Sequence, residues 1–141
     1  MKLLILGIFL VSIFNSESQT MGDIELIITN AKSDKGLIQV LVFNKEDGFP
    51  EEPKKALKAL SLTISNLSAR VFLEDLPAGN YAVSVFHDED SDGQIQKNNF
   101  GMPLESYGFS NNPTLYFGPP SFSKCTVALK NVPVKVEISL R

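Results

Sequence analysis

Apolar and polar residues alternate with a period of two over most of the chain beyond residue 23, which is typical of strands with one buried face. Clusters of turn-forming residues separate these runs. We predict strands at residues 24–28, 37–43, 61–65, 69–74, 81–87, 125–130 and 132–140. Seven short strands predict an all-β fold, an antiparallel β-sandwich of immunoglobulin-like or transthyretin-like type with one short helix and a long loop.

Two connections between the strands carry their own signals. Residues 51–60 have helical character, because Pro53 suits a first turn and a small apolar stripe follows it, so a crossover helix of one to three turns is expected. Residues 76–80 are predicted to form a turn, because Pro77 presets one turn dihedral and Gly79 accepts a positive φ.

Residues 88–121 contain no convincing strand, and 34 residues make a long connection for a compact domain. Long ordered loops of this kind are usually functional. We therefore expect the functional residues of this protein in or beside the segment 88–122.

This loop opens with alternating carboxylates. Asp88, Asp90 and Asp92 stand at positions 1, 3 and 5 of a calcium-binding loop, and Gly93 stands at position 6, where the chain turns sharply. Gln94, at position 7, can offer its backbone carbonyl. Because alternate carboxylates on a curling backbone converge on one hard cation, the string predicts a structural Ca²⁺ site.

Position 12 departs from that pattern. It is Asn99, which offers one amide oxygen in place of a bidentate carboxylate, and Glu105 would replace it if the chain folds back. Without the bidentate ligand, the expected affinity is weak, with a Kd of about 10⁻⁴ to 10⁻³ M. The alternative is an acidic, solvated turn whose aspartates only terminate a strand and cap local amides.

Aromatic residues are concentrated further along the loop, where residues 100–122 hold six of the 13 in the chain. They form either a small core of the loop itself or an exposed platform for a glycan, a peptide or an envelope protein. The predicted binding surface comprises His87, Glu105, Tyr107, Phe109 and Asn111.

An enzymatic alternative rests on the one histidine. His87 beside Asp88 suggests a base and its orienting carboxylate, as in an extracytoplasmic hydrolase. The nearby Ser84 falls on the opposite strand face, however, and Cys125 alternates with Val127 as a buried small hydrophobe rather than as a nucleophile. A non-catalytic module is therefore the preferred interpretation.

The first 18 residues are expected to be a cleaved signal peptide, because Lys2 precedes the apolar stretch 3–14 and small residues follow at Ser16 and Ser18. A retained anchor is the alternative, but the 12-residue stretch is short against the roughly 20 residues that cross a bilayer. The mature domain, 19–141, is expected to be secreted or periplasmic, without stable membrane insertion.

Charge and cysteine content narrow the partners. Sixteen acidic residues against 13 basic ones give a formal net charge of −3, which argues against a nucleic-acid partner. A lone cysteine cannot form an internal disulfide, so the fold must be stabilised by its core or by a metal.

One longer string has a family likeness. It runs through Leu76–Tyr81, His87-Asp88, Asp92-Gly93, Gly101-Met102-Pro103, Glu105 and Tyr107–Asn111. In this string the chain resembles the bacterial family catalogued as domain of unknown function 2141, over nearly all of the mature chain. The resemblance implies an exported bacterial protein and assigns no reaction.

Overall fold

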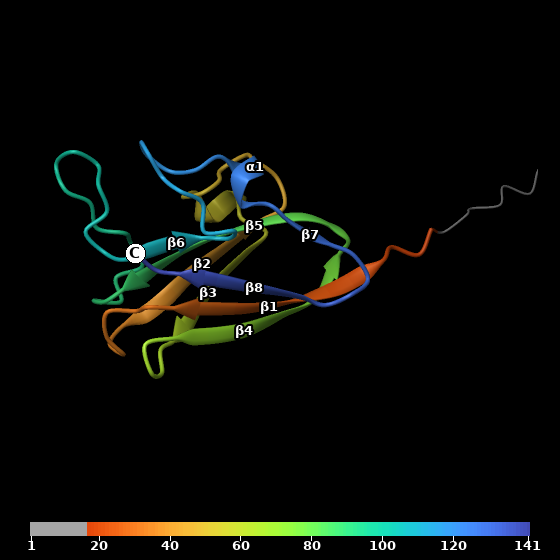
Figure 1. The fold of residues 1–141 in the computed structure, drawn as a ribbon, viewed down its shortest axis with the longest axis horizontal. Helices are drawn as coiled ribbons and strands as arrows, with labels where there is room; N and C mark the ends of the chain where they lie inside the picture. The colour runs from red at the N-terminus through yellow and green to blue at the C-terminus, as the bar shows by residue number, and fades with distance from the viewer. Residues whose placement is uncertain (1–16) are drawn as a thin grey trace, which may run out of the picture.

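A computed structural model describes residues 17–141, so the predicted signal peptide lies almost entirely outside the described residues. Eight strands and two short helical turns follow one another along the chain (Figure 1). They are β1 (Met21–Thr29), β2 (Leu37–Phe43), η1 (Pro53–Lys55), β3 (Lys58–Thr63), β4 (Ala69–Pro77), β5 (Gly79–Asp88), β6 (Tyr107–Phe109), α1 (Phe122–Cys125), β7 (Val127–Leu129) and β8 (Val134–Ser139). Within residues 17–141, neither helical segment is long and apolar enough to span a bilayer.

The strands form two sheets, which confirms the predicted all-β sandwich. The smaller sheet has the order β4-β1-β8, and the larger has the order β3-β2-β5-β6, with β7 paired to the start of β5. One pair departs from the antiparallel arrangement, because β8 runs parallel to β1. A parallel pair needs a long connection, and here almost the whole domain lies between the two strands.

The main core lies between the two sheets and follows the alternation seen in the sequence. Ile24, Leu26 and Ile28 of β1 are fully buried, as are Ile38 and Val42 of β2. β5 differs from the other strands because it is buried on both faces over most of its length. Its inner face joins the main core, and its outer face is covered by the loops that follow β2, β5 and β6.

The predicted crossover helix at residues 51–60 is wrong. Pro53 does begin a helical turn, but that turn is the single 3₁₀ turn η1, and the chain is extended again in β3 from Lys58 onward. Leu60 pairs with Val40 and is half-buried against the core. Pairing with the edge of β2 therefore overrides the weak helical pattern of this segment.

The predicted turn at residues 76–80 is also different in the structure. β4 continues through Pro77 and β5 begins at Gly79, so only Ala78 separates the strands as the chain crosses from one sheet to the other. Gly79 does not adopt a positive φ; Asp75 does, with φ of 53°, next to a register shift in β1. The bend is thus made by a bulge inside the β1–β4 pair.

Two predictions near the C-terminus need correction. The segment 88–121 does contain a strand, the three-residue β6, whose central Gly108 hides it from a pattern search. Cys125 is buried as predicted, but it ends the helical turn α1 rather than starting a strand, and β7 covers only Val127–Leu129.

Candidate functional site

The pairing of β5 with β6 brings two distant carboxylates together. In this antiparallel pair Ser84 lies opposite Phe109 and Phe86 lies opposite Tyr107. If the register is continued by two residues, Asp88 lies opposite Glu105, and the backbone N–H of His87 does donate to the carbonyl of Ser106 at 2.8 Å. Glu105 therefore returns to the end of β5, which is the condition under which it was expected to replace Asn99.

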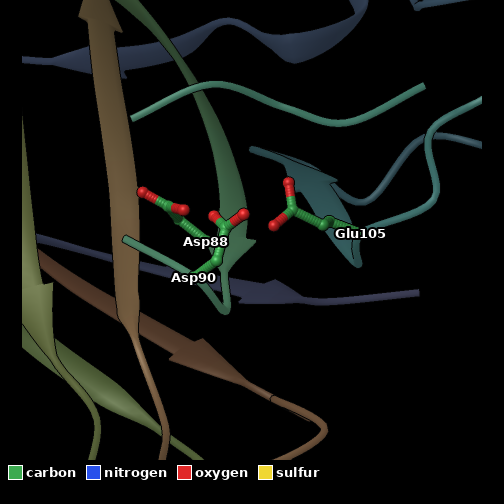
Figure 2. A group of neighbouring side chains, drawn as sticks. All are labelled: Asp88, Asp90 and Glu105. Atoms are coloured by element: carbon green, nitrogen blue, oxygen red, sulfur yellow. The ribbon is translucent and has the colours of Figure 1, made fainter. Parts of the chain in front are cut away.

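The carboxylates of Asp88, Asp90 and Glu105 converge at this point (Figure 2). Each offers an oxygen, and these oxygens all lie within 4.8 Å of one another. Asp88 and Glu105 are buried, whereas Asp90 is exposed. The group thus faces solvent on the side of Asp90, beside a shallow pocket of about 360 Å³.

Backbone amides hold these side chains in place. Asp88 accepts hydrogen bonds from the N–H groups of Asp92 (3.1 Å) and Gly93 (2.9 Å). Glu105 accepts from the N–H groups of Glu89 (3.3 Å) and Gln96 (3.0 Å). Such bonds orient the carboxylates, as in the outer shell of a metal site, and they leave a further lone pair on Asp88 Oδ1 and on each oxygen of Glu105.

A second support comes from two strands of the larger sheet. Ser61 Oγ donates to Gln39 Oε1 at 2.6 Å, and Gln39 Nε2 donates to Asp88 Oδ2 at 2.7 Å. Burial opposes ionisation of Asp88, but the hydrogen bonds from Gln39 and Gly93 outweigh it and hold the pKa of Asp88 below its usual range. Sequence reasoning missed Gln39 and Ser61, because polar residues on a strand face give no sign of what they contact.

The negative charge of the cluster is not matched by a neighbouring base. Among the described residues, none of the three carboxylates lies within 4.0 Å of a Lys, Arg or His nitrogen in an ion pair. Lys32 lines the same pocket without forming such a pair. Three carboxylates this close repel one another, and a hard cation would relieve that repulsion.

The other predicted ligands lie outside this group of three. The Asp92 carboxylate accepts the backbone N–H of Gln94 at 2.8 Å, and both residues are exposed. Asn99 is exposed in the protruding hairpin that follows, between the bridged residues Lys97 and Pro103. Of the predicted carboxylate ligands, the structure therefore brings together Asp88, Asp90 and Glu105 and leaves Asp92 outside the group.

His87 points away from this cluster. It lies on the inner face of β5, has no solvent exposure, and its Nε2 is 2.8 Å from the carbonyl oxygen of Lys35. Its Nδ1 finds no hydrogen-bond partner within residues 17–141 and lies 3.9 Å from a carboxylate oxygen of Glu89. The hydroxyl of Ser84 donates instead to the carbonyl of Pro50 at 2.6 Å, so Ser84, His87 and Asp88 do not form a hydrolytic array.

The aromatic segment contains both buried and exposed rings. Phe109 is buried in a small cluster on the outer face of β5, where its ring is 6.2 Å from that of Phe49 and 5.9 Å from that of Tyr107. Asn111 is used internally, because its amide donates to the carbonyls of Lys124 and Thr126. Other rings stay outside, namely Phe100, Tyr116 and Phe117.

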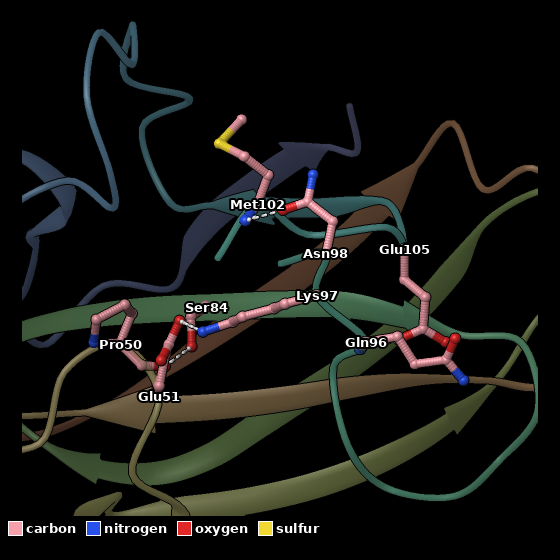
Figure 3. A network of polar contacts seen from close by, with 8 residues as sticks. All are labelled: Pro50, Glu51, Ser84, Gln96, Lys97, Asn98, Met102 and Glu105. Carbon is pink, nitrogen blue, oxygen red and sulfur yellow. Dashed lines mark hydrogen bonds and ion pairs between the residues drawn. The ribbon is translucent and has the colours of Figure 1, made fainter. Parts of the chain in front are cut away.

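The hairpin that carries Phe100 is tied to the rest of the molecule by polar contacts (Figure 3). Lys97 Nζ lies 2.7 Å from Glu51 Oε1, next to the bond from Ser84 to Pro50. The side-chain oxygen of Asn98 accepts the backbone N–H of Met102 at 3.0 Å. The loop between β5 and β6 is thus held by the Lys97–Glu51 ion pair at the base of the hairpin and by the Asn98–Met102 hydrogen bond near its tip.

Comparison with known proteins gives one match. Residues 26–137 match the model of a family described as an uncharacterized protein conserved in bacteria, DUF2141. No curated protein and no solved structure matches the chain. Since the matched region covers most of the chain, the protein belongs to this family, domain of unknown function 2141.

Proposed function

We propose that this protein is a non-catalytic, exported binding module whose loop 88–105 is ordered by a calcium ion held between Asp88, Asp90 and Glu105. The observation that carries the proposal is the convergence of three carboxylates from the two ends of that loop, with no basic partner among the described residues. The ordered loop would then support a neighbouring surface that binds a glycan, a peptide or an envelope protein.

The chemistry of the cluster favours calcium over other divalent ions. Ca²⁺ takes six to eight oxygen ligands in flexible geometry, whereas Mg²⁺ demands a near-ideal octahedron, and the cluster offers no thiolate or imidazole for a softer metal. Water molecules, together with oxygens of Asp92 and Gln94, would complete the shell. The small number of acidic ligands favours the weak regime, with a Kd of about 10⁻⁴ to 10⁻³ M, which suits an environment outside the cytoplasm.

Thermal unfolding in EDTA and then in increasing calcium tests this proposal, with magnesium as the control ion. At a calcium concentration about tenfold above Kd, the free energy of unfolding should rise by about 1.4 kcal/mol, which corresponds to a few degrees in Tm. A Tm that is the same in EDTA, calcium and magnesium would contradict the proposal and favour the alternative, in which the aspartates belong to an acidic, solvated turn.

Variants locate the site. Glu105→Gln should abolish the calcium-dependent rise in Tm, whereas Glu74→Gln, the same change at an exposed position on β4, should leave it intact. Asp92→Asn should reduce the response only partly, because its carboxylate lies outside the group of three. A full calcium response in the Glu105→Gln variant would place any bound ion elsewhere.

A further inference from the structure

We propose that two exposed loop tips, at Phe100 and at Tyr116-Phe117, form a docking surface for a lipid bilayer that carries anionic headgroups. We call these two segments the aromatic tips. The proposal goes beyond the partners considered for the binding module above, and it does not require the calcium ion.

The rings of the aromatic tips are almost entirely outside the protein. Phe100 is 91% exposed, Tyr116 81% and Phe117 99%, whereas Phe109, from the same segment, is buried. Met102 and Leu104 add exposed apolar atoms to the first tip. Clusters of exposed apolar side chains on a soluble surface mark sites of interaction with proteins or membranes.

The tip at Phe100 is held in shape before any partner arrives. The side-chain oxygen of Asn98 accepts the N–H groups of Phe100 (2.9 Å) and Met102 (3.0 Å), and the N–H of Asn98 donates to the carbonyl of Met102 at 2.9 Å (Figure 3). Gly101, at φ of 77°, makes the turn. A rigid tip loses little conformational entropy on binding.

The shape of the aromatic tips favours a broad surface over a peptide. Both loops project beyond the sheets on the side of β6 (Figure 1). The second tip encloses only a shallow pocket of about 230 Å³, lined by residues 114–121 and Lys124. The rings of two separate projecting tips can enter a deformable surface at the same time. The interface of a bilayer is such a surface, and it accepts aromatic rings at headgroup depth.

Charge complementarity points to anionic lipid. The chain has 16 acidic residues, yet the segments of the two tips, residues 93–104 and 106–121, contain none. Lys97, in the first of these segments, pairs with Glu51, so the free positive charge lies at the second tip. Lys124 lies beside Tyr116 and Phe117 at the pocket and forms no ion pair among the described residues. Lysines near a membrane surface attract anionic headgroups.

The absence of tryptophan from the chain allows a direct test. The variants Phe100→Trp and Phe117→Trp each place one reporter in a tip, and Phe72→Trp, 55% exposed on the outer face of β4, is the matched control. All are mixed with vesicles of phosphatidylcholine, with and without one third phosphatidylglycerol. We expect blue-shifted emission and quenching by brominated acyl chains at the two tips, more strongly with phosphatidylglycerol, and neither effect at residue 72.

A second measurement uses vesicle co-sedimentation. The double variant Phe100→Ser with Phe117→Ser should lower the partition coefficient about tenfold or more. The double variant Leu67→Ser with Phe72→Ser, also at exposed positions, should not. Every variant carries the same N-terminal residues, and equal urea midpoints show that each remains folded.

The result that would overturn the proposal is an emission maximum that does not move at either tip with both kinds of vesicle, in EDTA and in calcium. Equal shifts of the emission maximum at residues 100, 117 and 72 would overturn it as well. Insertion in EDTA or in calcium supports it. The calcium dependence of Tm, measured separately, decides the proposed metal site, so failure of one proposal can be told from failure of the other.

Discussion

The segment between β5 and β7 has two halves that are held by different forces. Residues 89–105 bury few apolar side chains, and their shape depends on amide groups that donate to Asp88, Asp90 and Glu105. Residues 106–126 are held by pairing of β6 with β5 and by an aromatic cluster that includes Phe109 and Phe122.

This difference determines what each half responds to. Apolar burial does not require a bound ion, so the second half should keep its structure in EDTA and in calcium alike. The first half concentrates negative charge, so its stability should vary with cations that bind there. One loop region can in this way combine a fixed support with an element that responds to its surroundings.

Removing the central ring of the second half should have the largest effect. Phe109→Ala should lower the free energy of unfolding by about 3–5 kcal/mol, because Phe109 is buried against Phe49 and Tyr107 and a cavity would remain. Urea denaturation measures the loss, and the calcium-dependent shift in Tm should survive. Loss of that shift in a folded variant would show that the halves are not independent.

Removing the central charge of the first half comes next. Asp88→Asn should cost about 2–3 kcal/mol, because one amide nitrogen would meet the donors of Gln39, Asp92 or Gly93 instead of accepting from them. The calcium response should disappear. Asp75→Asn, at an exposed position of β4, is the control. An equal loss of unfolding free energy in both variants would contradict the role of Asp88 as the central charge of the first half.

A backbone contact connects the first half to the sheet. A Cβ at Gly36 would lie 2.1 Å from the carbonyl oxygen of Asp88, and Gly36 has φ of 72°. Gly36→Ala should therefore cost about 1–3 kcal/mol and weaken the calcium response by displacing Asp88. Gly118→Ala is the control, because Gly118 also has a positive φ and no atom within 4 Å of its Cβ, but does not donate to Asp88 as Gly93 does. Equal calcium affinities in the two variants would speak against displacement.

The smallest effect is expected from the thiol of the second half. Burial raises the pKa of Cys125 from 9.0 to about 11. Below about pH 9 both the folded and the unfolded chain keep the proton; between about pH 9 and 11 only the unfolded chain loses it, so stability falls as the pH rises. The free energy of unfolding should drop by about 1 kcal/mol between pH 8 and 10.

The Cys125→Ala variant is the control for that titration, because it should lack this part of the pH dependence. Ellman's reagent should react with the thiol only as fast as the protein unfolds. Rapid reaction under native conditions would mean that the second half opens without global unfolding.

Strands with a clean alternation could be predicted from sequence, and segments governed by their neighbours could not. Residues 24–28 and 81–87 were placed correctly, because each carries a full set of buried positions on one face. The helix expected at 51–60 failed, since Leu60 is drawn into β3 by its pairing with Val40. β6 was missed because three residues around a glycine hold no detectable period.

The sequence by itself determined the all-β class, the buried alternation of the central strands and the acidic string at Asp88, Asp90 and Asp92. Those features depend on local spacing, which can be read along the chain. Only the tertiary structure decided that Glu105 joins Asp88 and Asp90, that Gln39 supports them, and that Phe109 is buried while Phe117 is exposed. These relations join residues far apart in sequence, and they arise from the register of β5 against β6 and β2.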